Sequence, residues 1–339
     1  MSIPPEVLFH RFFQTLGPED RAIYRGKADL IDTLQRRCHA PVDLLVRLQA
    51  AYNDALSKAK QVEAHAEHGI LFFDWVDSEE PNALAFSYEG YAFVGMTIGL
   101  VNLSWELCTR LSESGDVREA LGLNRALRPS SLHAALSREQ LLFILSHEWA
   151  HHVQGTVPGA SRVFADEVLG RDKGGLRSQA HEAAADGYAA YHGLEALLNS
   201  DARALAIALL EITEYSPEQQ DEILLALFVC AVAGFFFAHE PRTLTRENVR
   251  VFSHPPQIAR MGSFLNWVLM WCRDFRPQLT WLTPERFGRI FEAVAGAAWG
   301  LNGARDWQHQ VEFILTPEGR NYDLELQAVM NEHVRGSWH

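Results

Sequence analysis

Cysteine is scarce in this sequence, and no two cysteines are closely spaced. The 339 residues contain four, and they lie too far apart to indicate a disulfide framework or a Cys-x-x-Cys zinc site. We interpret them as small buried hydrophobic side chains. A chain without a disulfide framework is typical of a reducing compartment, so we expect a cytoplasmic protein. The four are Cys38, Cys108, Cys230 and Cys272.

The sequence also has fewer basic than acidic residues. The chain has 30 lysines and arginines against 43 acidic residues, a formal net charge of −13, and no long run of basic residues. A field of this sign repels phosphate backbones and anionic lipid headgroups. We therefore expect neither nucleic acid nor a membrane surface as a partner.

No apolar run is long enough to predict a membrane span. The longest, residues 223–238, falls short of the roughly twenty residues that a spanning helix needs, and Gly234 interrupts it. We predict a buried core helix there and no stable membrane insertion. The first residues lack the basic and apolar regions of a signal peptide, and we expect none.

The rest of the composition is that of a globular protein, with 47% hydrophobic and 22% charged residues. Apolar residues recur every three or four positions over residues 4–68 and over most of the chain after residue 100, which predicts helices. Between them, residues 70–97 hold short aromatic and β-branched runs separated by turn residues, which predicts strands. We predict a predominantly α-helical α+β protein with one small β-sheet.

No linker divides the chain clearly. The change of pattern near Gly69 indicates a helical N-terminal extension at 1–68, a core at 69–275 and a helical C-terminal region at 276–339. One compact domain formed by all three is the alternative.

An HExxH motif occupies residues 147–151. Ser137 and Gln140 form a capping box before an apolar run, which predicts a helix that contains the motif and ends near Gly155. The sheet is expected to pack on this helix.

On such a helix the motif has the geometry of a metal site. His147 and His151 are four residues apart, so they share one face and can bind one ion. Glu148 lies at the neighbouring edge, where a carboxylate can take a proton from a water that zinc has acidified. We predict zinc as the cofactor and Glu148 as the general base.

A catalytic zinc needs a third protein ligand and one open position. The candidate is Glu182, which shares a face of an alanine-rich helix with Asp186. We assign Glu182 to the metal and Asp186 to the free ring N–H of a ligand histidine. His181 is a rival third ligand, but it lies about 100° round the helix from Glu182. A solvated acidic face is the alternative, and the surrounding alanines argue against it.

A third cluster begins at His254. Pro255 and Pro256 place His254 just before a helix, with Arg260 about one turn inside it. A histidine held there can hydrogen-bond to the oxyanion of a tetrahedral intermediate. From spacing alone, a helix entry with an incidental histidine is an equally good interpretation.

In this order the HExxH, ExxxD and HPxxxxR motifs resemble the gluzincin metallopeptidases, in particular the CAAX-prenyl/heat-shock type. The resemblance covers residues 70–262. It implies that Glu182 ligates zinc, that His254 stabilises the transition state and that Arg260 pairs with an acid of the site. It also implies that a strand at 91–97 is an exposed edge that binds substrate by strand addition.

That type carries transmembrane helices, which this sequence does not predict. An acidic chain with the same motif order is also similar to Lit-like phage-exclusion peptidases and to immunity-regulating zinc peptidases of bacteria. This similarity implies a single selected protein target and a role in bacterial defence.

We therefore expect a zinc metalloendopeptidase that cleaves a protein or peptide substrate, with Tyr188 or Tyr191 assisting His254. One alternative is a non-catalytic, zinc-stabilised regulatory module, in which His152 or His181 closes the metal site as a fourth ligand. Glu148 argues against that alternative, because a structural site has no use for a base. Another is a latent protease, in which the loop at 155–177 covers the site until a regulatory partner binds.

Overall fold

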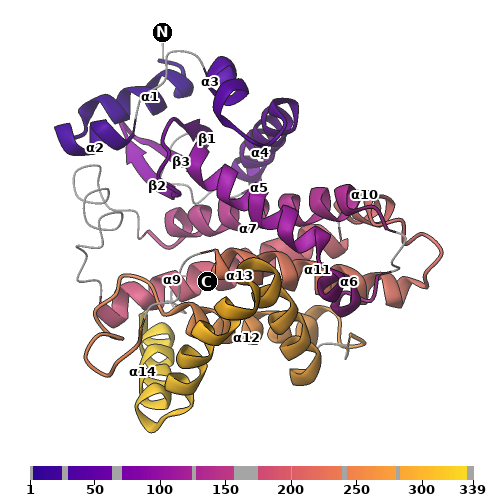
Figure 1. The fold of residues 1–339 in the computed structure, drawn as a ribbon. Coiled ribbons are helices and arrows are strands. Elements are labelled where there is room, and N and C mark those ends of the chain that lie inside the picture. The colour runs from indigo at the N-terminus through magenta and orange to yellow at the C-terminus, as the bar shows by residue number, and fades with distance from the viewer. Residues whose placement is uncertain are drawn as a thin grey trace. The chain divides into compact units, whose positions relative to one another are not determined.

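The computed structural model describes residues 3–24, 30–62, 71–123, 127–155, 175–199, 201–238, 243–279 and 283–333. Within these ranges the chain forms α-helices and one three-stranded sheet (Figure 1), which confirms the predicted, predominantly helical α+β class.

Contacts divide the chain into two compact units. One unit is Met1–Trp105 with Glu148–Asp172, and the other is Glu106–His147 with Lys173–His339. Each unit is discontinuous in sequence, so the three regions predicted from the sequence stay a prediction.

The first unit contains the N-terminal helices and the sheet. Its elements are α1 (Pro5–Thr15), α2 (Pro18–Ile23), α3 (Leu30–Arg37), α4 (Val42–Val62), β1 (Leu71–Val76), β2 (Ala83–Tyr88) and β3 (Tyr91–Thr97). Helix α5 (Ile98–Glu113) follows β3 directly and continues into the second unit.

Strand β3 lies in the centre of the sheet. The order is β1-β3-β2, with β3 parallel to β1 and antiparallel to β2. Glu89 and Gly90, with φ of 47° and 80°, form the two-residue turn between β2 and β3. Because β3 is paired along both sides, the prediction that residues 91–97 are an exposed, substrate-binding edge is wrong.

Helix α1 covers one face of this sheet (Figure 1). Its buried Phe9 and Phe12 pack on Phe86 and Phe93, and the Phe12 and Phe86 rings stack with centroids 4.1 Å apart. Aromatic side chains recur every second residue along the strands, so one face supplies the whole cluster. The predicted strands and the helix before them therefore share one core.

Helix α4 covers the outer edge of β1. The Asn53 side chain accepts a hydrogen bond from the Phe73 N–H at 2.8 Å and donates one to the Phe73 carbonyl at 3.0 Å. These are groups that β1 would otherwise present to another strand.

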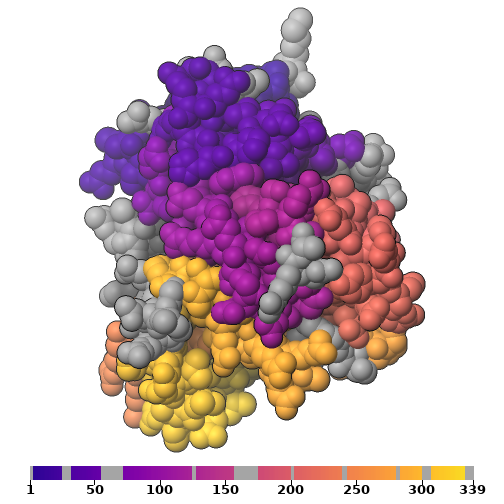
Figure 2. Space-filling model, turned by 45° about the vertical axis from the view of Figure 1, so that its right-hand side comes forward, coloured from indigo at the N-terminus to yellow at the C-terminus, as the bar shows by residue number. Residues whose placement is uncertain are grey.

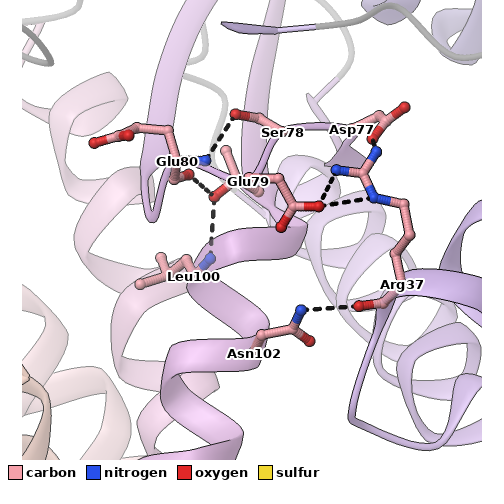
Figure 3. Close-up of polar contacts among 8 residues, drawn as sticks. Arg37, Asp77, Ser78, Glu79, Glu80, Leu100 and Asn102 are labelled. Atoms are coloured by element: carbon pink, nitrogen blue, oxygen red, sulfur yellow. Dashed lines mark hydrogen bonds and ion pairs between the residues drawn. The ribbon is translucent and has the colours of Figure 1, made fainter.

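The loop after β1 is tied to α3 and α5. Figure 3 shows Arg37 paired with Asp77 and Glu79, while Asn102 of α5 donates to the Arg37 carbonyl at 2.9 Å. A Cβ on Gly99 would lie 2.1 Å from the Glu79 carbonyl oxygen, so the approach of this loop to α5 requires glycine there.

The second unit is helical in its described residues. It contains α6 (Gly115–Ala120), α9 (Gly175–Asn199), α10 (Asp201–Leu209), α11 (Pro217–Phe237), α12 (Gln257–Phe275), α13 (Pro284–Leu315) and α14 (Pro317–His333). Helix α14 packs against α9 and α13. Figure 2 shows its yellow surface beside the orange-yellow surface of α13.

Helix α7 (Pro129–Val153) carries the HExxH motif, and the boundary between the units falls within it. The predicted start at Ser137 is wrong, because the helix begins at Pro129 and Ser137 is a buried interior residue. The predicted end is confirmed, with Gly155 in the left-handed region at φ 63°. His152 Nε2 lies 2.9 Å from the Phe93 carbonyl oxygen, so the last turn of α7 packs on the sheet as predicted.

Helix α11 is a core helix. By length and composition it qualifies as a membrane span, but 83% of its apolar window is buried within the structure. The predicted burial of this segment is therefore confirmed. All four cysteines are free, and three of them, Cys108, Cys230 and Cys272, are buried.

Small residues along α9 let two helices approach it closely. A Cβ on Gly187 would lie 2.4 Å from the Trp267 ring of α12, and one on Gly193 would lie 2.5 Å from the Phe228 ring of α11. This packing brings the start of α12 towards the acidic residues of α9.

Candidate metal centre

Three side chains of ligand type meet between α7 and α9. His147, His151 and Glu182 each offer one donor atom, and these atoms all lie within 4.8 Å of one another. His147 and Glu182 are buried, and His151 is half-buried. The two histidines are one helical turn apart on the same face of α7. This group can hold a metal ion.

Both ring nitrogens of His147 face carboxylates of α9. Nε2 lies 3.1 Å from Glu182 Oε2, and Nδ1 lies 2.9 Å from Asp186 Oδ1. Burial alone would lower the pKa of His147, but the hydrogen bonds to the two carboxylates raise it to about 10. The two carboxylates thus favour the protonated form of His147. Because only a neutral imidazole ligates a metal, an ion held here would displace a proton from this ring.

Asp186 also binds Arg260 of α12. Arg260 donates from Nε to Oδ2 at 2.8 Å and from Nη2 to Oδ1 at 2.7 Å. Burial would raise the pKa of Asp186, but Arg260 and His147 together lower it, so the carboxylate is ionised. The guanidinium also lies over the Phe236 ring, 4.6 Å from its centroid.

His254 lies on the same carboxylate as His147. Its Nε2 is 3.2 Å from Glu182 Oε2, and its Nδ1 is 2.9 Å from the Ser253 hydroxyl. The His254 side chain is 38% exposed, unlike those of Glu182 and Asp186. The structure thus brings together residues from all three motif clusters of the sequence.

Glu148 is half-buried on α7, one position after His147. The rival ligands differ in their surroundings. His152 Nε2 lies within hydrogen-bond distance of the Phe93 carbonyl oxygen of β3, so this nitrogen contacts the sheet and not the metal group. Among the described residues, the ligand group includes neither His152 nor His181.

The two tyrosines proposed to assist His254 have ring contacts elsewhere on α9 and α12, and their role stays a prediction. The Tyr191 ring packs against Trp267 and Phe275. Tyr191 lies nine residues after Glu182 on α9, which is roughly 13 Å along the helix axis. The Tyr188 ring lies on His192, with centroids 4.3 Å apart. The covering loop predicted at 155–177 lies almost wholly outside the described residues.

Two residues near the site, Gln179 and Tyr322, belong to no motif in the sequence. Both are fully buried and joined by a 2.8 Å hydrogen bond from the Tyr322 hydroxyl to Gln179 Oε1. Gln179 lies two residues before His181 in α9, and Tyr322 lies in a region without any recognisable motif. No local pattern indicated that they touch.

Comparison with known protein families, curated proteins and solved structures found no match to this chain. The resemblance to gluzincins thus rests on the motifs alone and stays a prediction.

Proposed function

We propose that the protein is a zinc-dependent metallopeptidase that hydrolyses peptide bonds in a selected protein substrate. The observation that carries this proposal is the meeting of His147, His151 and Glu182, with Glu148 on the same helix as the two histidines. Two imidazoles and one carboxylate are a ligand set typical of catalytic zinc, which keeps a fourth position open. Calcium and magnesium favour sites built from oxygen ligands alone.

Each residue of the site then has a defined task. His147, His151 and Glu182 would hold the zinc ion, which would supply Lewis acidity towards water and the scissile carbonyl. Glu148 would accept a proton from the attacking water and donate it to the leaving amine. His254 lies partly exposed beside Glu182, which supports a role for it as hydrogen-bond donor to the oxyanion. Asp186, held by Arg260, fixes the orientation of His147.

A structural zinc site is the weaker alternative. It needs a fourth protein ligand, and His152, one of the two candidates from the sequence, is bonded to a strand carbonyl. Three further parts of the proposal rest only on the composition and motifs of the sequence. They are a cytoplasmic location, a role in bacterial defence and a latent state that a partner releases.

The test compares the wild-type protein with Glu148→Gln. Both variants should bind one zinc ion, measured by elemental analysis after dialysis, because Glu148 is not a ligand. With candidate protein targets, only the wild-type protein should create new N-termini detectable by mass spectrometry. A zinc chelator should abolish this cleavage. Equal cleavage by Glu148→Gln would overturn the assignment of the general base.

A further inference from the structure

The segment before His254 is fastened to α9 by one buried amide. Gln179 donates from Nε2 to two carbonyls of this segment, Val249 at 3.0 Å and Phe252 at 2.9 Å. Its Oε1 accepts the hydrogen bond from Tyr322 of α14 at 2.8 Å. Tyr322 therefore fixes the direction in which the Gln179 amide points.

Helix α14 also holds this segment by packing and by charge. The Val249 side chain is fully buried in a cluster that α9, α12 and α14 build together. Arg250 donates to Glu325 of α14 from Nε at 2.7 Å and from Nη2 at 2.9 Å. The segment of residues 249–252 is thus bonded to Gln179 of α9 and also contacts α14.

The fastening point and the metal group share one helix. Gln179 lies about one turn before Glu182 on α9, and the Phe252 carbonyl lies two residues before His254. The same short segment is therefore bonded to α9 at Phe252 and again at His254, whose Nε2 is 3.2 Å from Glu182 Oε2. Loss of the first bond therefore removes the contact nearest to His254 and loosens the second.

A purely stabilising role does not require these polar groups. Apolar side chains of similar volume can stabilise a buried contact as well as hydrogen-bonded ones. A fully satisfied buried network instead fixes one geometry, because any other arrangement leaves a polar group unpaired. The three hydrogen bonds of the Gln179 amide thus specify where the segment lies.

We propose that Gln179 and Tyr322 are positioning residues that hold His254 against the Glu182 carboxylate. Helix α14, which lies outside the region that resembles gluzincins, then belongs to the active-site machinery. The inference rests on the proposed function, since it takes His254 to act on the substrate.

The first experiment needs no substrate. Tyr322→Phe removes the hydroxyl and keeps the ring. The matched control is Tyr24→Phe, at a buried tyrosine of the other unit whose hydroxyl accepts a hydrogen bond from Asn82 at 3.2 Å. The probes are the ring signals of His254 in ¹⁵N-histidine-labelled full chain, assigned with His254→Ala, and amide exchange of residues 249–254, with and without zinc.

Tyr322→Phe should shift or broaden the His254 ring signals and speed exchange of the segment about fivefold or more. Tyr24→Phe should do neither. Glu325→Gln changes a side chain that is 46% exposed, and it should act in the same direction more weakly. An unchanged His254 signal and unchanged exchange in Tyr322→Phe and Glu325→Gln would overturn the inference.

The second experiment uses any substrate that the wild-type protein cleaves. Tyr322→Phe should lower kcat about fivefold with KM unchanged, and it should have no further effect in the His254→Ala background. Equal losses of kcat in both backgrounds would overturn the positioning role. If the wild-type protein cleaves nothing while Tyr322→Phe moves the His254 signals, the proposed function fails and the placement of His254 by Tyr322 stands.

Discussion

Asp186 Oδ1 lies 2.9 Å from His147 Nδ1 and 2.7 Å from Arg260 Nη2, so one buried oxygen connects a candidate metal ligand with a cation of another helix. The three residues come from α7, α9 and α12. A carboxylate in this position fixes the orientation of the imidazole and increases its basicity as a ligand. Arg260 keeps that carboxylate ionised, because its charge and hydrogen bonds contribute to lowering the pKa of Asp186.

Asp186→Asn should therefore weaken metal binding without removing a ligand. We expect zinc affinity to fall about 10- to 100-fold, measured by competition with a chelating dye. The metal-free protein should lose about 3 kcal/mol of unfolding free energy, because the guanidinium of Arg260, whose side chain is only 12% exposed, loses its carboxylate partner. Asp221→Asn, which breaks an ion pair with Arg203 in the same unit, is the control and should leave zinc affinity unchanged. Equal zinc affinities in the two variants would contradict this role.

Removal of the metal should destabilise the protein. A ligand that binds only the folded state adds about 2.7 kcal/mol at a free concentration about 100 times its Kd. Thermal unfolding should therefore shift to a lower temperature when a zinc chelator is added. Glu148→Gln should show the same shift, whereas His147→Ala and Glu182→Ala should show little or none. A chelator effect that survives in both ligand variants would place the metal elsewhere.

The sequence predicted the site better than it predicted the sheet, for a physical reason. Residues four apart on a helix share a face whatever surrounds the helix, so the pairing of His147 with His151 follows from spacing. Glu182 and Asp186 are also four residues apart, so once α9 packs on α7 with Glu182 at His147, Asp186 lies at His147 as well. Strand β1 pairs with β3, in parallel, and not with β2, which follows it in the sequence. No local sequence pattern predicts this strand order.

Long-range contacts account for the other differences. Ser137 has the pattern of a helix cap, but the chain before it finds buried positions for its own apolar residues, and the helix extends back to Pro129. The Tyr322 hydroxyl meets Gln179 across 143 residues of sequence. Contacts of this kind depend on how helices that are distant in the sequence pack together, and local sequence patterns do not predict that packing.

The close approach of α9 and α12 predicts a steric effect at Gly187. A Cβ there would lie 2.4 Å from the Trp267 ring, so Gly187→Ala should cost about 1 to 3 kcal/mol of unfolding free energy. It should also weaken zinc binding, because Asp186 is adjacent and depends on Arg260 of α12. Gly296→Ala in α13 meets nothing within 4 Å and should instead stabilise the protein by about 0.5 to 1 kcal/mol. Urea unfolding of both variants measures the contrast, and a destabilised Gly296→Ala with an unaffected Gly187→Ala would contradict it.

Glu139 of α7 predicts a pH dependence of stability that is separate from the metal site. Burial raises its pKa to about 7 against the opposing effect of its ion pair with Arg138. The folded state therefore binds this proton more tightly than the unfolded state, in which a glutamate titrates near 4.5. The stabilisation is complete below that pH and is lost as the pH rises through 7, by up to about 3 kcal/mol.

Urea unfolding of the metal-free protein between pH 5 and pH 8 tests this sign. The wild-type protein should lose stability over this range. Glu139→Gln should remove the part of the loss below about pH 6.5, because its amide cannot ionise, and the raised pKa of His147 accounts for the loss that remains above it. The two proteins should then differ most at pH 8, where the variant is the more stable. Glu119→Gln, at an exposed position, is the control and should keep the wild-type slope. If Glu139→Gln also keeps that slope, the buried carboxyl is not its source.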